Sequence, residues 1–136
     1  MITAVDTNVL LDVFLMDPRF GQASAKCLRE ALGIGVIVAC DLVWAETAAV
    51  FPGKADFEKA MHTLEMQFSP LNRTAAVAAG AAWKRYRAAG GKRIRMMADF
   101  LIGAHAAVQC DGLLTRDRGF YRNFFRRLKI VDPTCV

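Results

Sequence analysis

The run of residues 34–39 constrains the fold more than any other segment of this chain. Its sequence, IGVIVA, places apolar side chains or glycine at every position, so both faces of an extended strand would be apolar. A strand that is apolar on both faces is typical of the interior of a parallel sheet, where helices cover each side. The run therefore predicts an α/β domain with a buried central strand.

Other short apolar runs alternate with helical patterns along the rest of the chain, which predicts an α/β fold with a mostly parallel sheet of four to five strands and helices on both faces. No linker, repeat or low-complexity segment interrupts the pattern, so residues 1–136 are expected to form a single domain. Gly33 is expected to end the second helix and Asp41 to cap the third. The expected strands are 2–5, 34–39, 112–115 and 128–131, with an extended piece at 68–71, and the expected helices are 8–16, 22–32, 42–50, 55–67, 74–89, 98–108 and 120–127.

Composition restricts where such a chain can work. Hydrophobic residues make up 54% of the sequence, but no apolar stretch reaches the roughly 18–20 residues of a membrane span. The N-terminus has no basic segment before its first apolar run, so it does not resemble a secretory signal. The four cysteines form no Cys-x-x-Cys pair or Cys/His cluster, which argues against a zinc or redox site. A protein of the reducing cytoplasm, without a membrane partner, is expected.

Four carboxylates stand at the edges of apolar elements or within them, rather than in polar loops. Each alone has an ordinary explanation, as a helix cap, an exposed helical position or a turn residue. Taken together, near the strand-to-helix switches where α/β folds place their chemistry, they predict one acidic pocket. Asp12, one helical turn beyond Asn8, is expected to be exposed. The four residues are Asp6, Glu46, Asp99 and Asp117.

The charge balance supports a site of this kind. The chain carries 18 basic and 13 acidic residues, a net charge of +5. If four acids form one pocket, the remaining surface is strongly basic, which suits a phosphodiester substrate held over metal ions. A charge that serves only solubility is the alternative. Gathered carboxylates repel each other unless protons or cations compensate, and hard oxygen ligands select Mg²⁺ or Mn²⁺.

The acids also lie within motifs that resemble those of PIN-domain ribonucleases of the VapC toxin type. The resemblance covers residues 2–133, and all four motifs occur in the family's order and at similar spacing. It implies a three-layer α/β/α PIN-like fold and Mg²⁺- or Mn²⁺-dependent endoribonuclease activity. The motifs are VDTNVLL (residues 5–11), WAE (44–46), ADFLIGAHA (98–106) and LTRDRGF (114–120).

By the same resemblance, the four acids are the metal-binding and catalytic residues. Asp6 and Asp99 would hold an ion that orients the scissile phosphate and lowers the pKa of a bound water. Glu46 would bind the same ion and help to deprotonate the nucleophile, and Asp117 would complete a first or second ion site. The supporting polar residues implied near the site are Thr7, Asn8 and Thr115.

Basic residues adjoin two of the acids in sequence, and they predict a path for RNA phosphates toward the pocket. A solvated helix face is the alternative. Tyr121, Phe124 and Phe125 are candidates for stacking on bases, although core packing is the better explanation for the phenylalanines. His62 and His105 are expected to be structural. The residues named as candidate RNA contacts are Lys92, Arg93, Arg95, Arg116 and Arg118.

Other functions remain open at this stage. A haloacid-dehalogenase-type phosphatase would need Asp at position 8, where this chain has Asn, and a receiver-like domain would need paired acids at the first strand. A non-catalytic RNA-binding module would use only the basic surface. Within the PIN resemblance, the VapC likeness implies an antitoxin protein as partner and a homodimer, while a nuclease of RNA maturation is the alternative role.

Overall fold

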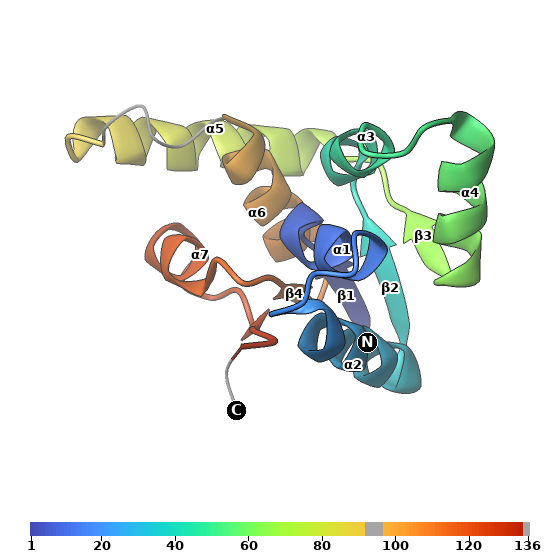
Figure 1. Cartoon of the computed structure of the whole chain (residues 1–136). Helices are drawn as coiled ribbons and strands as arrows, with labels where there is room; N and C mark the ends of the chain where they lie inside the picture. The colour runs from blue at the N-terminus through green and yellow to red at the C-terminus, as the bar shows by residue number, and fades with distance from the viewer. Residues whose placement is uncertain (92–96, 135–136) are drawn as a thin grey trace.

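The computed structural model describes residues 1–91 and 97–134 of the chain. Strands and helices alternate along the described residues, as the sequence pattern predicts (Figure 1). The strands are β1 (Ile2–Val5), β2 (Val36–Ala39), β3 (Met66–Phe68), β4 (Gly112–Leu114) and β5 (Ile130–Val131), and the helices are α1 (Thr7–Phe14), α2 (Gly21–Ile34), α3 (Asp41–Ala48), α4 (Lys54–Thr63), α5 (Arg73–Ala88), α6 (Met97–Gln109) and α7 (Arg118–Phe124).

The five strands form one parallel sheet in the order β3-β2-β1-β4-β5. The chain leaves the central strand β1 toward β2 and β3, and then crosses back to place β4 on the other side of β1. The order therefore reverses between β1 and β4. In open parallel sheets, the carboxyl ends of the strands at such a reversal form a crevice that usually holds the ligand. Val5 is paired with Leu114 at this point, so the residues that follow them are neighbours.

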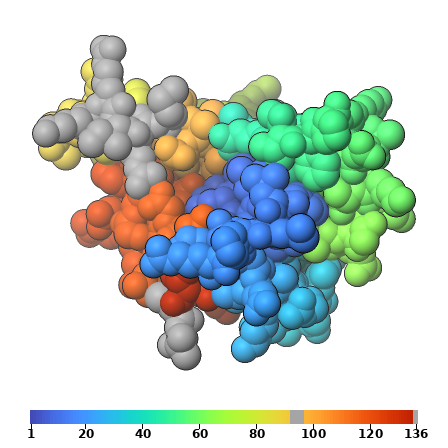
Figure 2. All heavy atoms as spheres, viewed as in Figure 1, coloured from blue at the N-terminus to red at the C-terminus, as the bar shows by residue number. Residues whose placement is uncertain are grey.

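Helices cover both faces of the sheet, which confirms the predicted α/β architecture. Helix α2 packs against β2 on one face, and α6 packs against β1 and β4 on the other (Figure 1). Both faces of β1 are therefore buried: Thr3, Ala4 and Val5 are each at most 3% exposed. In the space-filling view, α1 and α2 occupy the centre of one face, with α3 and α4 on one side and α7 on the other (Figure 2). Within the described ranges, no helix combines the length and apolar character that a bilayer crossing requires.

Several element boundaries differ from the sequence predictions. Helix α2 continues past Gly33 to Ile34, and Gly35 follows it because a side chain there would collide with the backbone of Met1. Asp41 does not cap α3: the cap position is Cys40, and the Asp41 carboxylate accepts a hydrogen bond from the Leu71 amide at 3.3 Å. The helix expected over 55–67 ends at Thr63, which leaves Met66–Phe68 free to form the edge strand β3.

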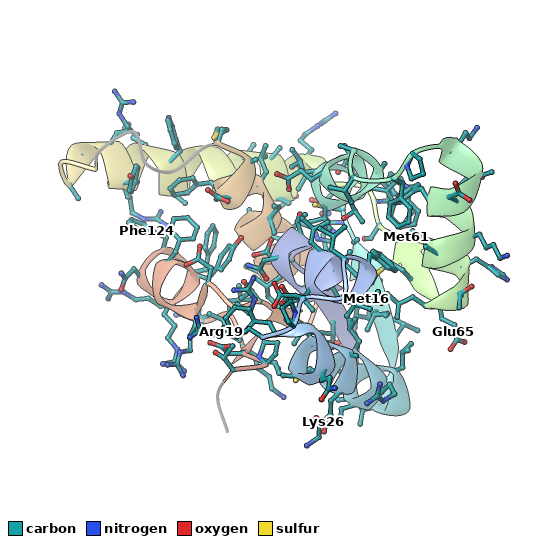
Figure 3. The ribbon with its side chains drawn as sticks, viewed as in Figure 1. Met16, Arg19, Lys26, Met61, Glu65 and Phe124 are labelled. Atoms are coloured by element: carbon teal, nitrogen blue, oxygen red, sulfur yellow. The ribbon has the colours of Figure 1, made fainter. Side chains whose placement is uncertain are left out.

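Aromatic packing holds α7 against α5 and α6. Phe124 lies between α7 and α5, where its ring centroid is 5.5 Å from that of Tyr86 and 5.7 Å from that of Phe100 (Figure 3). Gly103 of α6 is required here, because a side chain would overlap the ring of the buried Phe125. Core packing is thus the role of both phenylalanines, as expected. The position of α7 matters because Asp117 is the N-cap residue of this helix.

Candidate active site

Asp6 lies at the reversal point of the sheet, beside the end of β4. Because Val5 pairs with Leu114, Asp6 and Thr115 leave adjacent strands side by side, and the Asp6 amide still donates to the Leu114 carbonyl at 2.9 Å. The hydroxyl of Thr115 donates to Asp6 Oδ2 at 2.8 Å. Asp6 is also the N-cap of α1, since its Oδ1 accepts a hydrogen bond from the Thr7 amide. The sheet register therefore fixes this carboxylate at the crevice.

Asp6 is the only one of the four predicted site acids that is buried. It is 7% exposed, and this desolvation raises its pKa from 3.8 to about 6, against the lowering effect of hydrogen bonds from Thr115, Thr7 and Tyr121. The negative charge of Asp99 raises the pKa of Asp6 further. Without a compensating cation, a charged Asp6 is thus held at a cost in free energy at neutral pH.

Tyr121 joins the carboxylates, although the sequence reasoning placed it among possible base-stacking residues. It is 1% exposed, which rules out stacking on RNA, and its hydroxyl donates to Asp6 Oδ2 at 3.2 Å. Burial and the negative charges of Asp6, Asp99 and Asp117 all raise the pKa of Tyr121. Three of the predicted acids therefore act on the same phenol. The available signal was its spacing, four residues after Asp117 on a helix, which brings it back over the first turn.

Glu46 reaches the same edge from a different helix. It lies on α3 with an exposed side chain, and its Oε1 accepts a 2.7 Å hydrogen bond from the hydroxyl of Thr7. Because the Thr7 amide donates to Asp6, the one threonine bridges both carboxylates. Helix α3 was the least specific part of the sequence pattern, and packing of α3 against α1 supplies the proximity that the sequence alone does not show.

Asp99 and Asp117 are placed by helix starts. Asp99 lies in the first turn of α6, where the helix dipole favours a negative charge, and it is partly buried. Asp117 occupies the N-cap position of α7, and its side chain makes no capping hydrogen bond there. The backbone amide of Asp117 donates to Thr115 Oγ1 at 3.0 Å.

Thr115 and Asn8 connect these groups. Thr115 Oγ1 donates to Asp6 and accepts from the Asp117 amide, so one hydroxyl ties the end of β4 to the start of α7. The Asn8 side-chain amide lies 3.4 Å from both Asp6 Oδ2 and Thr115 Oγ1, and its oxygen accepts from the Arg116 amide at 3.2 Å. The expected supporting residues therefore all contact the acids or each other, and their effect is to fix the loop that carries Asp117.

Asp12 and Arg116 form a second, buried anchor for that loop. The prediction that Asp12 is exposed is wrong, since it is 3% exposed and binds Arg116 through both oxygens, at 2.7 and 3.0 Å. Ser24 of α2 donates to Asp12 at 2.8 Å, and the Arg116 guanidinium lies 4.1 Å from the ring centroid of Phe20. A paired carboxylate tolerates burial where a lone one would not. The charge of Arg116 is thereby largely neutralised, so its expected contact with RNA stays a prediction with less support.

This anchor makes a stability prediction. Replacing Asp12 with Asn should cost about 2 kcal/mol, because it leaves a partly buried guanidinium without its partner. A double-mutant cycle of Asp12→Asn and Arg116→Gln, measured by urea unfolding, should give a coupling energy of about 1.5–2.5 kcal/mol. The exposed pair Lys26–Glu30, with 3.9 Å between its charged atoms, is the matched control and should couple by less than about 0.5 kcal/mol. Equal coupling in the two pairs would contradict the anchor.

Arg118 is the other expected RNA contact within the described residues. Arg118 lies 3.9 Å from the Asp132 carboxylate, with 41% of its side chain exposed. Lys92, Arg93 and Arg95 lie outside the described residues. His105 is structural as expected, because it is 1% exposed and its Nε2 lies 2.9 Å from Ser69 Oγ.

The donor set fits a hard divalent cation. Every candidate ligand is a carboxylate oxygen, and Oδ1 of Asp6 accepts one hydrogen bond from the described residues, which leaves a lone pair for a further partner. As the side chains stand, no three His, Cys, Asp or Glu residues in 1–91 and 97–134 are close enough to hold one ion. The raised pKa of Asp6 nevertheless indicates that this carboxylate has less positive charge around it than its ionised form requires.

Comparison with known protein families agrees with this geometry. The family model for the PIN domain matches residues 3–124, a range that includes all four acids and Tyr121. No curated protein matches the chain by sequence.

Solved structures with the same fold share little sequence. A chain of VapBC2 from Rickettsia felis, bound to a DNA fragment from its promoter, aligns with a TM-score of 0.77 and 17% identity, covering 97% of this chain and 98% of that one. VapBC-1 from nontypeable Haemophilus influenzae aligns with a TM-score of 0.72 and 17% identity, covering 99% of this chain and 100% of that one. A toxin–antitoxin complex from Klebsiella pneumoniae aligns with a TM-score of 0.67 and 17% identity, covering 98% of this chain and 99% of that one. At these identities the likeness concerns the fold.

Proposed function

This chain belongs to the PIN-domain family, and we propose that it is a metal-dependent endoribonuclease, the toxin of a toxin–antitoxin pair. The observation that carries the proposal is the buried Asp6 at the sheet reversal. The negative charges of Asp99 and Asp117, like that of Asp6, raise the pKa of the Tyr121 phenol that donates to Asp6. Three negative charges in a partly dehydrated crevice repel one another, and a divalent cation offsets that repulsion. We propose residues 1–136 as a single domain with this one active site.

Each residue has a distinct part in the proposed reaction. Asp6 and Asp99 would hold Mg²⁺ or Mn²⁺, Asp117 would complete the ligand set, and such an ion supplies a water of lowered pKa and charge stabilisation at the phosphate. Glu46 is exposed and therefore able to meet solvent and substrate, so it would accept the proton of the attacking water. The Thr7 hydroxyl orients Glu46, and Tyr121 and Thr115 orient Asp6.

Charge favours a nucleic-acid substrate. The chain has a net charge of +5 although four of its acids are assigned to the crevice, so the rest of the surface is basic. The substrate must therefore be attracted by the basic surface, and it can bind beside the acids only when cations offset their charge. A phosphodiester backbone meets both conditions. RNA rather than DNA is the substrate that the motif resemblance implies.

Incubation of the purified protein with total RNA tests the activity. Cleavage with defined new ends is expected in Mg²⁺ or Mn²⁺ and not in EDTA, because the acids cannot hold the phosphate alone. A DNA oligonucleotide of the same sequence as an identified RNA site is the control for sugar specificity. Equal cleavage in EDTA would contradict the metal-dependent mechanism, and binding without any product in either metal would favour a non-catalytic RNA-binding module.

The proposed toxin role rests on the toxin–antitoxin complexes that share this fold. It implies a small antitoxin partner that covers the crevice, a homodimer and action in the cytoplasm without a membrane. Exposed apolar side chains offer area for protein contacts: Leu15 and Met16, which follow α1, are 59% and 82% exposed. Met16 is labelled in Figure 3. Growth arrest on expression, relieved by co-expression of the neighbouring gene's product, would test this role, and unaffected growth would favour RNA maturation.

A further inference from the structure

A second charged site lies at the amino ends of the strands, opposite the end that carries the predicted acids. A cavity of about 590 Å³ opens between the end of α6, the end of α7 and the start of β5. Arg85, Arg126, Arg127 and Lys129 line it, and one acid, Asp111, is also present. Asp111 and Lys129 directly precede β4 and β5, so the cavity is at the amino ends of these strands. Asp6 and Asp117 are at the carboxyl ends.

The cavity has an unbalanced positive charge. All four basic side chains are exposed, and none of them forms an ion pair with another residue in the described part of the chain. The carboxylate of Asp111 is occupied by a 2.6 Å hydrogen bond from the Ile2 amide. The Arg85 guanidinium donates to the Phe124 carbonyl at 3.3 Å, which fixes it at the rim with donors to spare. Four cations around one hollow, Arg85 from α5 and three from residues 126–129, favour an anion with several charges.

Helix α7 connects this cavity to the acidic crevice. The helix begins after Asp117 and ends two residues before Arg126, so the two sites are separated by about 10 Å of helix. Arg122, exposed on α7, lies between them in the sequence. A single strand of nucleic acid that follows α7 would span this separation with about two or three nucleotides' length of backbone or less.

We propose that this cavity binds phosphates of the RNA strand beside the one that is cut, and so acts as an anchor outside the catalytic crevice. The inference rests on the proposed nuclease function and names the part of the protein that holds its substrate. Without cations the acidic crevice repels phosphates, so RNA affinity in EDTA must come from elsewhere on the surface. Arginine guanidinium groups suit phosphate oxygens, which they bind through paired hydrogen bonds. An acidic protein segment would satisfy the same charges, but the path along α7 to the catalytic acids favours RNA.

Binding of a fluorescent single-stranded RNA oligonucleotide in EDTA tests the anchor without cleavage. The double variant Arg126→Gln/Arg127→Gln should bind about tenfold more weakly than the unchanged protein. The slope of log Kd against the logarithm of the salt concentration should fall by about one or more, because two phosphate contacts are lost. Lys129→Gln should weaken binding in the same direction. The matched control is Lys26→Gln/Arg29→Gln, which removes two exposed charges from α2 and should change Kd by less than about twofold.

The possible results separate the anchor from the nuclease activity. Equal affinities for the Arg126/Arg127 variant and the α2 control, with both variants folded by circular dichroism, would overturn the anchor. So would loss of binding to an oligoglutamate peptide in the Arg126/Arg127 variant with RNA affinity intact, because that pattern assigns the cavity to an acidic protein partner. Weakened RNA binding in EDTA, together with no cleavage by the unchanged protein in any metal, would support the anchor while refuting the proposed nuclease.

Discussion

Replacing Asp99 with Asn is expected to reduce metal-dependent RNA cleavage by about a hundredfold or more. Residues that only orient metal ligands change affinity or activity by about 10–100-fold when mutated, so loss of a direct ligand should reach at least the upper end of that range. Asparagine keeps the shape of the side chain in the first turn of α6 and removes the charge that acts on Asp6. The fold should survive, because a first-turn carboxylate contributes only about 0.3–1 kcal/mol through the helix dipole.

The chain provides a matched control for this substitution. Asp56 also lies in the first turn of a helix, α4, and is exposed. Asp56→Asn loses the same helix-dipole interaction and should cleave RNA at the unchanged rate, measured as initial velocity at saturating Mg²⁺. Asp6→Asn should fall to the level of Asp99→Asn, and the two combined should fall little further, because both would serve one ion. Full activity in both single variants would contradict the assignment of the acids.

The sequence predicted the parts of the site that follow from strand ends, and missed those that follow from packing. Asp6 and Thr115 could be placed because parallel strands end at one edge, and the alternation of elements predicted that sheet. Glu46 was named from its place within an apolar helix and from a motif, but nothing in that helix shows that α3 packs against α1. An apolar pattern predicts which face of a helix is buried, but not which neighbour covers it.

The polar residues of the interior were the hardest to predict. Tyr121 and Asp12 both read as surface residues, yet each is buried because a specific partner satisfies it: Asp6 for the phenol, and Arg116 for the carboxylate. Those partners are 115 and 104 residues away in sequence. A single sequence contains no local signal for pairs at this separation, so the structure is needed to see that Arg116 holds a loop.

The metal-free protein is expected to lose stability as the pH rises from about 4 to about 7, through the ionisation of Asp6. Its pKa is 3.8 in the unfolded chain and about 6 in the fold, so the folded state binds this proton more tightly. A raised pKa contributes stability that is complete below pH 3.8 and is lost as the pH passes through about 6. The full difference corresponds to about 3 kcal/mol, of which about 1.4 kcal/mol falls between pH 5 and pH 7.5.

Comparison with the Asp6→Asn variant isolates this contribution. The variant has no titrating group at position 6, so the free energy of unfolding of the unchanged protein minus that of the variant, measured in EDTA by urea unfolding, should fall by about 1.4 kcal/mol from pH 5 to pH 7.5. Asp17 and His105 also have shifted pKa values, both lowered, but the two proteins share these residues, so their contributions cancel in the difference.

Addition of Mg²⁺ or Mn²⁺ then connects stability to function. At about pH 7.5 the cation should raise the free energy of unfolding of the unchanged protein, by about 2.7 kcal/mol at a concentration a hundred times the Kd, and should leave Asp6→Asn nearly unaffected. At about pH 5 the same concentration should stabilise the unchanged protein less, because the ion must displace the proton that the folded state holds. A pH-independent difference between the two proteins in EDTA would show that burial does not disfavour the charged form of Asp6. Equal stabilisation of both proteins by the cation would show that Asp6 is not a ligand.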